Sequence, residues 1–241
     1  MLLVIPIVLL VIPIVLLLDV APELLFYNFY MGPVTVQNLR PLRLRVILFA
    51  KAPVPGRVKT RLAAAVGMTQ AAALHRAFVA DMIEKLMPLG LLELHTDIKT
   101  DEWSGFQVTR RLQARGDLGQ RMYLALSGVS SLPAILIGGD APTLPAGHLE
   151  NLISSKADIA LGPAEDGGYY AIFCRNINPR MFDGVEWSTG RTLEQTVRAV
   201  TSQGLSVELG PMWWDVDEPE DLDRLKADPH LPRFTREVLC P

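Results

Sequence analysis

From about residue 43 onward, short apolar runs alternate with longer segments whose apolar positions follow helical spacing. Arg45–Lys51 predicts a strand. The segment that begins at Thr69, a possible N-cap, predicts a helix to about Met87. Ala134–Gly138 is apolar throughout, which is typical of a central parallel strand covered on both faces. This alternation predicts an α/β domain whose mostly parallel sheet carries helices on both sides.

The same pattern continues along the rest of the chain. We expect further strands at Leu91–Ile98, Phe106–Gln113, Asp158–Leu161, Tyr169–Cys174 and Ser206–Leu209. Further helices are expected at Asp117–Val129, His148–Ser155, Thr189–Gln203 and Glu218–Lys226, with Asp117 and Thr189 as N-caps. Prolines after Asp228 indicate a tail that wraps or dangles. The chain thus divides into an extension over 1–42, a domain over 43–228 and a tail over 229–241.

The extension holds seventeen uncharged apolar residues over 2–18, in which LLVIPIV occurs twice in tandem. This length is at the short limit for a membrane-spanning helix, and Pro6 and Pro13 would each remove a helical hydrogen bond. A signal peptide would require a Lys or Arg before the apolar run, and none is present there. We favour an extension outside the functional protein, with Met31 as an alternative start. A membrane anchor and a signal sequence stay open as alternatives.

Composition and charge narrow the classes of function. The chain is 49% hydrophobic and 20% charged, as is ordinary for a globular protein. A net charge of -3 and a pI near 5.8 argue against general nucleic-acid binding, so any phosphate site must be local. Cys174 and Cys240 lack metal-ligand spacing, which makes a disulfide framework improbable and fits a reducing compartment. The four histidines form no zinc pattern, and we expect His75 and His148 to lie on helices.

The densest basic cluster follows the first predicted strand. The segment FAKAPVPGRVKTRL over 49–62 places four cations around a Pro-x-Pro-Gly turn: Lys51, Arg57, Lys59 and Arg61. Four cations on a stiff loop between a strand and a helix suit a diphosphate or triphosphate better than a protein core. The alternative interpretation is a solvated basic loop.

Two acidic motifs lie where predicted strands end. Asp140 in IGGDAPT leaves the apolar strand and can hold a divalent cation against phosphate oxygens, or it can cap the turn before Pro142. In WWDVDEPEDL, Asp215 and Asp217 point the same way on an extended segment. They could face a metal as an acceptor-only pair, or Asp217 could be the N-cap of the following helix.

A third acidic motif, GPAEDGGYY, places Asp166 before Gly167 and Gly168. Paired glycines allow close backbone approach or a positive φ, although Asp-Gly is also a common hairpin turn. Ligands of parallel α/β sheets bind beyond the carboxyl ends of the strands. We therefore expect Asp166, Asp140, Asp217 and the basic loop to meet at that edge.

GDLGQR forms another junction between a loop and a helix. Its backbone N–H groups and Arg121 could meet a base, a ribose or a phosphate, whereas Asp117 could simply cap the helix and leave Arg121 solvated. The chain contains neither a P-loop motif nor a GxGxxG fingerprint. No constellation for covalent nucleophilic catalysis is visible.

Six motifs in fixed order, FAKAPVPGRVKTRLA, GDLGQRM, LIGGDAPTL, LGPAEDGGYYAI, EWSTGRTLEQT and DVDEPEDL, resemble a bacterial family of GT-A-like transferases. Its members are known as nucleotide-diphospho-sugar transferases, some as arsenosugar-biosynthesis glycosyltransferases. The match spans roughly residues 44–226. The layout is more distantly similar to phospholactate guanylyltransferase and to the molybdenum-cofactor guanylyltransferases. The resemblance implies a three-layer α/β fold of the GT-A type with a mostly parallel or mixed sheet.

The resemblance also implies roles for single residues. The donor phosphates and nucleotide would be bound by Lys51, Arg57, Lys59, Arg61, Gly116, Asp117 and Arg121. Mg²⁺ or Mn²⁺ would be bound by Asp140 and Asp217, and the acceptor by Asp166, Gly167 and Gly168. The catalytic residues would be Lys59, Asp140 and Asp166. This chain departs from the family in its N-terminal extension, and mildly at 139–141, where small residues replace Ser and Cys.

Three functions follow as hypotheses. The first is a metal-dependent transferase that uses a nucleotide-diphospho-sugar donor. The second is a nucleotidyltransferase that couples an NTP to a phosphorylated small acceptor. The third is a non-catalytic, membrane-tethered nucleotide-binding module. We favour the first, as a cytoplasmic protein without nucleic-acid partners. Contact with the cytoplasmic face of a membrane through residues 2–18 is the alternative location.

Overall fold

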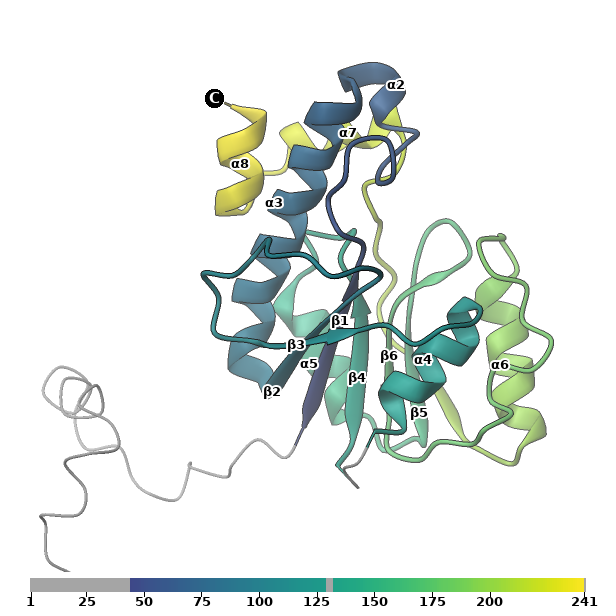
Figure 1. Cartoon of the computed structure of the whole chain (residues 1–241). Coiled ribbons are helices and arrows are strands. Elements are labelled where there is room, and N and C mark those ends of the chain that lie inside the picture. Colours follow the sequence, from purple (N-terminus) through teal and green to yellow (C-terminus); the bar gives the residue numbers. More distant parts are fainter. Residues whose placement is uncertain (1–43, 129–131, 241) are drawn as a thin grey trace, which may run out of the picture. The chain divides into compact units, whose positions relative to one another are not determined.

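The computed structural model describes residues 44–128 and 132–240 (Figure 1). The expectations about residues 2–18 and the predicted helix end at Val129 lie outside these residues. In the part of the chain that is described, no helix combines the length and the apolar character needed to cross a membrane.

Every strand and helix predicted for the described residues is present. The strands are β1 (Arg45–Ala50), β2 (Leu91–Thr96), β3 (Thr109–Leu112), β4 (Ala134–Gly138), β5 (Ile159–Pro163), β6 (Tyr169–Cys174) and β7 (Val207–Leu209). The helices are α2 (Ala63–Val66), α3 (Met68–Leu86), the 3₁₀ turn η3 (Met87–Leu89), α4 (Leu118–Leu126), α5 (Ala146–Ser154), α6 (Thr192–Ser202), α7 (Pro219–Lys226) and α8 (Arg233–Leu239).

The strands form one sheet in the order β3-β2-β1-β4-β6-β5-β7. Neighbouring strands pair in parallel except at β6, which is antiparallel to both β4 and β5. A tight turn joins β5 to β6, with Ala164 N donating to Gly168 O, and so short a connection can only produce an antiparallel pair. The predicted mostly parallel, mixed sheet is confirmed.

Helices cover both faces of the sheet, which gives three layers (Figure 1). Alternate residues of β1 point to opposite faces, so Val46 and Leu48 pack beneath α3 and α5, whereas Ile47 and Phe49 pack beneath α4 and α6. The apolar strand β4 divides in the same way and is buried on both sides, as its composition predicted. The strand ends that carry polar residues therefore lie at the edge of a rigid, fully covered sheet.

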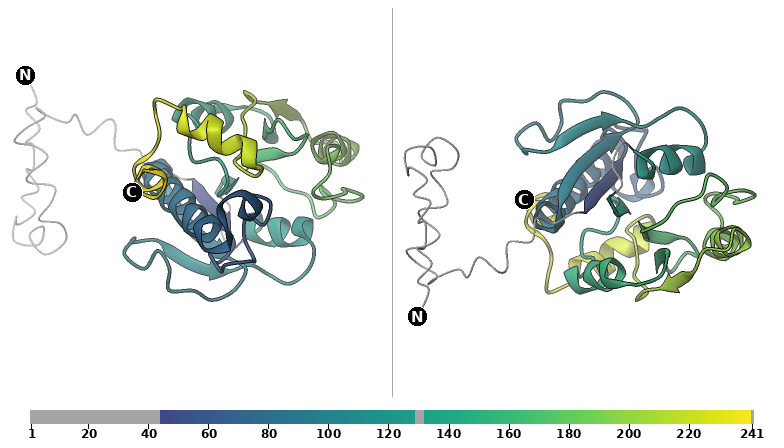
Figure 2. Two further views of the ribbon diagram at one scale, coloured as in Figure 1. Left: turned by 90° about the horizontal axis from the view of Figure 1, so that it is seen from above. Right: turned by 90° about the horizontal axis from the view of Figure 1, so that it is seen from below.

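A further apolar cluster joins α7 and α8 to the N-terminal half of α3. The tail expected to wrap or dangle thus contains a helix, and α8 lies beside α3 (Figures 1 and 2). The carboxylate of Asp81 on α3 accepts hydrogen bonds from Phe234 N at 2.9 Å and from Thr235 N at 2.8 Å. These bonds satisfy N–H groups of the first turn of α8, which have no partner within that helix.

Two of the predicted N-caps are wrong, and α5 begins at Ala146 rather than His148. Helix α3 begins at Met68. Gly67, with a φ of +83°, interrupts the helical conformation between α2 and α3, so Thr69 lies inside the helix. Helix α6 begins after Arg191 rather than Thr189. The carbonyl of Thr189 instead accepts a hydrogen bond from Thr192 N at 3.2 Å, forming a turn that precedes the helix.

Candidate functional site

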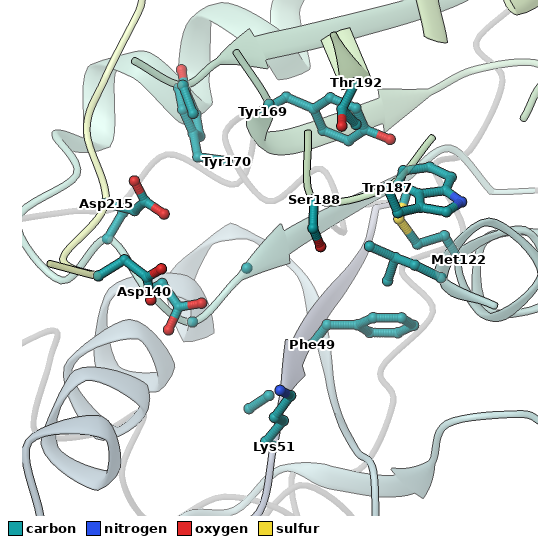
Figure 3. A pocket seen from close by; sticks show the side chains of 18 of the residues that line it. Phe49, Lys51, Met122, Asp140, Tyr169, Tyr170, Trp187, Ser188, Thr192 and Asp215 are labelled. Atoms are coloured by element: carbon teal, nitrogen blue, oxygen red, sulfur yellow. The ribbon is translucent and has the colours of Figure 1, made fainter. Parts of the chain in front are cut away.

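A cavity of about 610 Å³ opens at the carboxyl ends of β1 and β4 and at the start of β6 (Figure 3). We call it the edge cavity. The polar and aromatic residues that line it are Phe49, Lys51, Lys59, His75, Gln113, Asp117, Arg121, Asp140, Asp166, Tyr169, Tyr170, Trp187, Ser188, Thr189, Thr192, Asp215 and Asp217. This is where ligands of parallel α/β sheets bind, and it confirms the predicted meeting of the basic loop with the acidic motifs.

Lys59 contacts two of the predicted acidic residues. Its ammonium lies 2.6 Å from Asp140 Oδ1 and 3.5 Å from Asp217 Oδ1, and 3% of its side chain is exposed. The backbone of Lys59 has a φ of +46°, a left-handed conformation that a non-glycine residue adopts only when its surroundings impose it. The loop therefore holds this ammonium against the carboxylates.

Both members of the Lys59–Asp140 pair stay charged at neutral pH. Burial by itself would lower the pKa of Lys59, but the charges of Asp140 and Asp217 raise it above its usual value. Burial would raise the pKa of Asp140, but the charge of Lys59 and the nearby His75 hold it well below its usual range. Asp140 thus presents a carboxylate, of which 47% of the side chain is exposed.

His75 of α3 connects the basic loop to Asp140. Its Nε2–H donates to Lys51 O at 3.0 Å, and its Nδ1 lies 3.7 Å from Asp140 Oδ1. Only 5% of the side chain is exposed. The imidazole therefore packs between the end of β1 and the residue that follows β4, and it keeps these two segments together.

The four predicted loop cations divide into two groups. Lys51 and Lys59 line the edge cavity. Arg57 instead lies 3.3 Å from Asp97, and Arg61 contacts Asp217 at 3.2 Å and Glu218 at 2.8 Å. Both arginines have exposed side chains outside the cavity lining, so they hold the loop to its neighbours.

The start of α4 supplies another cation. Asp117 is the N-cap, as predicted: its Oδ1 accepts from Gln120 N at 2.8 Å in a capping box, and Gly116 precedes it with a φ of +120°. Arg121 Nη1 donates to Gln113 Oε1 at 2.8 Å. Arg121 is thereby held by a neutral acceptor at the cavity wall, while Gly116 lies outside the lining.

The β5–β6 turn forms the opposite wall. Asp166 Oδ1 accepts from Gly168 N at 2.8 Å, and both residues line the cavity. Gly167 has a φ of +83°, and a Cβ atom on it would lie 2.3 Å from Gly190 O. The carbonyl oxygen of Gly167 accepts a hydrogen bond from Leu193 N at 2.9 Å, which fixes the turn to the start of α6. Of the three residues predicted to bind the acceptor, Gly167 thus has a structural position behind the wall.

Asp215 and Asp217 lie on the segment that leads from β7 to α7. The N-cap of α7 is Glu218, so the alternative that Asp217 fills that position is wrong. Burial, together with the charge of Asp166, raises the pKa of Asp215 to about 6. Among the described residues no cluster of three or more His, Cys, Asp and Glu side chains is arranged to hold a metal. A cation here would take ligands from Asp140 and Asp217 and from its substrate.

The aromatic and hydroxyl-bearing part of the cavity was not predicted from the sequence. Phe49 and Met122 belong to the sheet core and also reach the cavity, while Trp187 and Ser188 approach from the segment before α6 (Figure 3). The motif EWSTGRTLEQT contains Trp187 and Ser188 and was the only available signal. Ser188 has a φ of +60°, which no sequence pattern revealed.

The fold is that of the transferases that act on nucleotides or nucleotide sugars. A solved structure from Desulfovibrio desulfuricans G20, provisionally named a nucleotide-diphospho-sugar transferase, matches with a TM-score of 0.74 and 32% identity. The match covers 82% of this chain and 94% of that one. A family model described as "Uncharacterized protein conserved in bacteria (DUF2064)" matches residues 91–189. The chain belongs to this bacterial family, as its motifs predicted.

Two curated relatives are more distant. The 2-phospho-L-lactate guanylyltransferase of Methanoculleus marisnigri is 29% identical over 171 residues, covering 70% of this chain and 76% of that protein. The enzyme of the same name from Methanocorpusculum labreanum is 35% identical over 107 residues, covering 41% of this chain. The chain spans about half the length of the latter protein, 46%. These matches agree with the distant resemblance noted in the sequence.

Proposed function

We propose that this protein is a metal-dependent transferase that uses a nucleotide-diphospho-sugar donor. The observation that carries the proposal is the charged group Lys59–Asp140–Asp217 inside the edge cavity, in a family represented by a nucleotide-diphospho-sugar transferase. A buried cation held between carboxylates at the binding edge of an α/β sheet is suited to a reaction in which phosphate charge develops.

The cations of the cavity are placed to bind a diphosphate. Lys51 lies at the end of β1 with an exposed side chain, and Arg121 is held by the neutral oxygen of Gln113. The positive charges of Lys51 and Arg121 are therefore not neutralised by a carboxylate. Arg57 and Arg61, by contrast, each form an ion pair with a carboxylate. We therefore assign the donor phosphates to Lys51 and Arg121, and a supporting role in the loop to Arg57 and Arg61. Lys59, which is paired with Asp140 and Asp217, orients the carboxylates that would hold the metal.

The carboxylates fit Mg²⁺ or Mn²⁺. Asp140 and Asp217 contact the same ammonium, and 47% and 43% of their side chains are exposed. Oxygen ligands are what these cations prefer, and Mg²⁺ is usually held by one or two carboxylates together with substrate phosphates and water. When bound there, the cation would neutralise charge on the departing diphosphate.

Asp166 lies on the wall opposite Lys51 and is the candidate base. In the proposed reaction, an acceptor hydroxyl oxygen forms a bond to the anomeric carbon of the donor. The bond from that carbon to the diphosphate oxygen breaks, and its electron pair leaves with the nucleoside diphosphate. The acceptor proton goes to the carboxylate of Asp166, whose Oδ1 is oriented by Gly168 N. Lys51 and Arg121 stabilise the negative charge on the leaving group.

Nucleotidyl transfer is the second candidate, and the curated guanylyltransferases favour it. The same cations would then bind an NTP, and pyrophosphate would leave. A non-catalytic module is disfavoured because loss of the candidate metal ligands would be expected in it, and both Asp140 and Asp217 are present. For either transferase we place the protein in the cytoplasm, with a nucleotide donor and a small-molecule acceptor as partners and no nucleic acid.

A panel of nucleotide sugars and NTPs, each with Mg²⁺ or Mn²⁺, tests this proposal by thermal unfolding. A ligand that binds only the folded state raises the melting temperature according to its affinity and concentration. We expect nucleotide sugars to give the largest shifts, and nucleoside diphosphate to be the product in their presence. Larger shifts with an NTP and release of pyrophosphate would favour the second candidate. No shift with any nucleotide would refute both.

A further inference from the structure

We propose that the acceptor is a neutral polyhydroxylated molecule, a sugar or polyol, rather than a phosphorylated or carboxylated one. The inference rests on the proposed function, because it assigns the acceptor to the wall of the edge cavity that faces Asp166. It would separate this protein from its curated relatives, whose name specifies an acceptor that carries a phosphate.

Charge is distributed unequally around the edge cavity. The lining cations Lys51 and Lys59 come from the loop after β1, and Arg121 comes from α4. On the acceptor wall, which is formed by the β5–β6 turn, the segment before α6 and the segment after β7, the described lining residues include no Lys or Arg. The ionisable side chains on this wall are those of aspartates and tyrosines, notably Asp166 and Asp215.

Arginines near this wall are already paired and lie outside the lining. Arg191 Nη2 lies 2.5 Å from Glu186 Oε2, and Arg224 donates to both carboxylate oxygens of Glu165 at 2.7 and 3.0 Å. Phosphate-binding sites use arginines whose donors are free for a bidentate contact. An acceptor phosphate at this wall would therefore meet the carboxylates of Asp166 and Asp215. The cation that acts on Asp215, Lys59, is already paired with Asp140 and Asp217.

The same wall offers the groups that bind hydroxyls. Carboxylates accept hydrogen bonds only, so Asp166 and Asp215 select ligands that donate, as the hydroxyls of a sugar do. The Ser188 hydroxyl points into the cavity, and Trp187 lies beside it (Figure 3). The indole is held edge-on by Phe182, with ring centroids 5.6 Å apart. An apolar ring next to the Ser188 hydroxyl matches the alternating C–H and O–H groups of a sugar.

The test compares neutral acceptors with partners that carry one phosphate more: glucose with glucose 6-phosphate, and glycerol with glycerol 3-phosphate. Lactate and 2-phospho-L-lactate serve as the carboxylated comparison, and both should respond less than glucose or glycerol. The full chain is assayed for release of nucleoside diphosphate from UDP-glucose and GDP-mannose with Mg²⁺. Melting temperatures are measured with each acceptor, with and without nucleotide sugar. We expect the neutral sugar or polyol to exceed its phosphorylated counterpart by about tenfold or more in kcat/KM or in apparent affinity.

Substitutions test whether the preference for a neutral acceptor arises at this wall. Asp215→Asn removes a charge from the acceptor wall and should reduce the preference for the neutral member about tenfold, whereas Asp223→Asn, at a side chain that is 89% exposed on α7, should leave it unchanged. Thr189→Lys should improve use of the phosphorylated member. A stronger response to a phosphorylated acceptor in the unmodified protein overturns the inference, as does no response to the neutral members. Failure of nucleotide sugars to bind refutes the proposed function instead, and the acceptor melting series without nucleotide still decides the inference.

Discussion

The ammonium of Lys59 lies 2.6 Å from Oδ1 of Asp140, and the two residues come from loops that follow different strands of the sheet. One carries the basic motif and the other the first acidic motif. The pair is formed because β1 and β4 are parallel neighbours, so that their carboxyl ends meet. Because the Lys59 ammonium is buried against Asp140, removing the charge of Asp140 should also lower the free energy of unfolding of the domain.

Replacing Asp140 with Asn should therefore reduce both stability and activity. The buried Lys59 ammonium would keep only the 3.5 Å contact with Asp217, and a poorly compensated buried charge costs about 1–3 kcal/mol. The domain should still fold, with turnover reduced about 100-fold or more. Urea denaturation and steady-state assays measure the two effects. The double variant K59M/D140N should regain stability without activity. A double variant as unstable as D140N would argue against a role for the buried charge.

Nucleotide binding should distinguish the cations that line the edge cavity from those that hold its loop. Arg121→Ala removes a charged donor from the lining and should weaken nucleotide binding about tenfold. Arg57→Ala, at a side chain that is 55% exposed and paired with Asp97, should change it less than about threefold. Titration calorimetry with a nucleotide and Mg²⁺ compares the variants. Equal losses in both would show that the phosphates lie outside the cavity lining.

Gly167 should tolerate substitution worse than another glycine with a similar backbone. Gly167 and Gly204 have φ values of +83° and +76°, so alanine is strained at either position by about 1 kcal/mol. Only at Gly167 would the new Cβ also clash, at 2.3 Å from Gly190 O. Gly167→Ala should thus lower the free energy of unfolding by about 1–3 kcal/mol more than Gly204→Ala. Denaturant titrations of both variants decide this, and equal effects would contradict the close packing of the turn against Gly190.

Glu93 should make the domain sensitive to acid. Burial alone would raise its pKa, but hydrogen bonds from His95 and Arg45 and the charge of Arg45 bring it below the ordinary value of 4.5. A carboxyl whose pKa is lower in the folded state stabilises the fold above the unfolded pKa and loses this contribution as the pH falls through the folded one. Unfolding free energies measured between pH 6 and pH 3 should therefore fall less steeply in Glu93→Gln. Glu194→Gln, at an exposed helical pair, should retain the steep profile.

Several features of the site could be predicted from sequence because they depend on local order. A polar residue that follows an apolar strand lies at the carboxyl edge of a parallel sheet, and this placed Lys51, Asp140 and Asp166 correctly around one cavity. The cap of α4 by Asp117 was also predictable, since capping uses residues three positions apart. The helix start expected at Thr69 was wrong. The N-cap of α3 is Gly67, and no polar side chain caps this helix.

Other features depend on partners distant in sequence. Arg57 and Arg61 are cations of the basic motif, as the sequence requires of phosphate ligands. Their ion pairs with Asp97 and Asp217 nevertheless hold them outside the cavity lining. Trp187 and Ser188 reach the cavity only because the segment before α6 folds back over the β5–β6 turn. The predicted tail became a helix because Asp81, more than 150 positions earlier in the chain, caps it.

The sequence by itself determined the α/β order, the positions of the strands and the family, because hydrophobic periodicity and short motifs are properties of neighbouring residues. The tertiary structure decided which charges are compensated. Lys59 is neutralised by carboxylates from two other loops, Arg121 is held by a neutral amide, and the wall that carries Asp166 and Asp215 is acidic. Coulomb interactions depend on distance in space, and only the folded chain sets those distances.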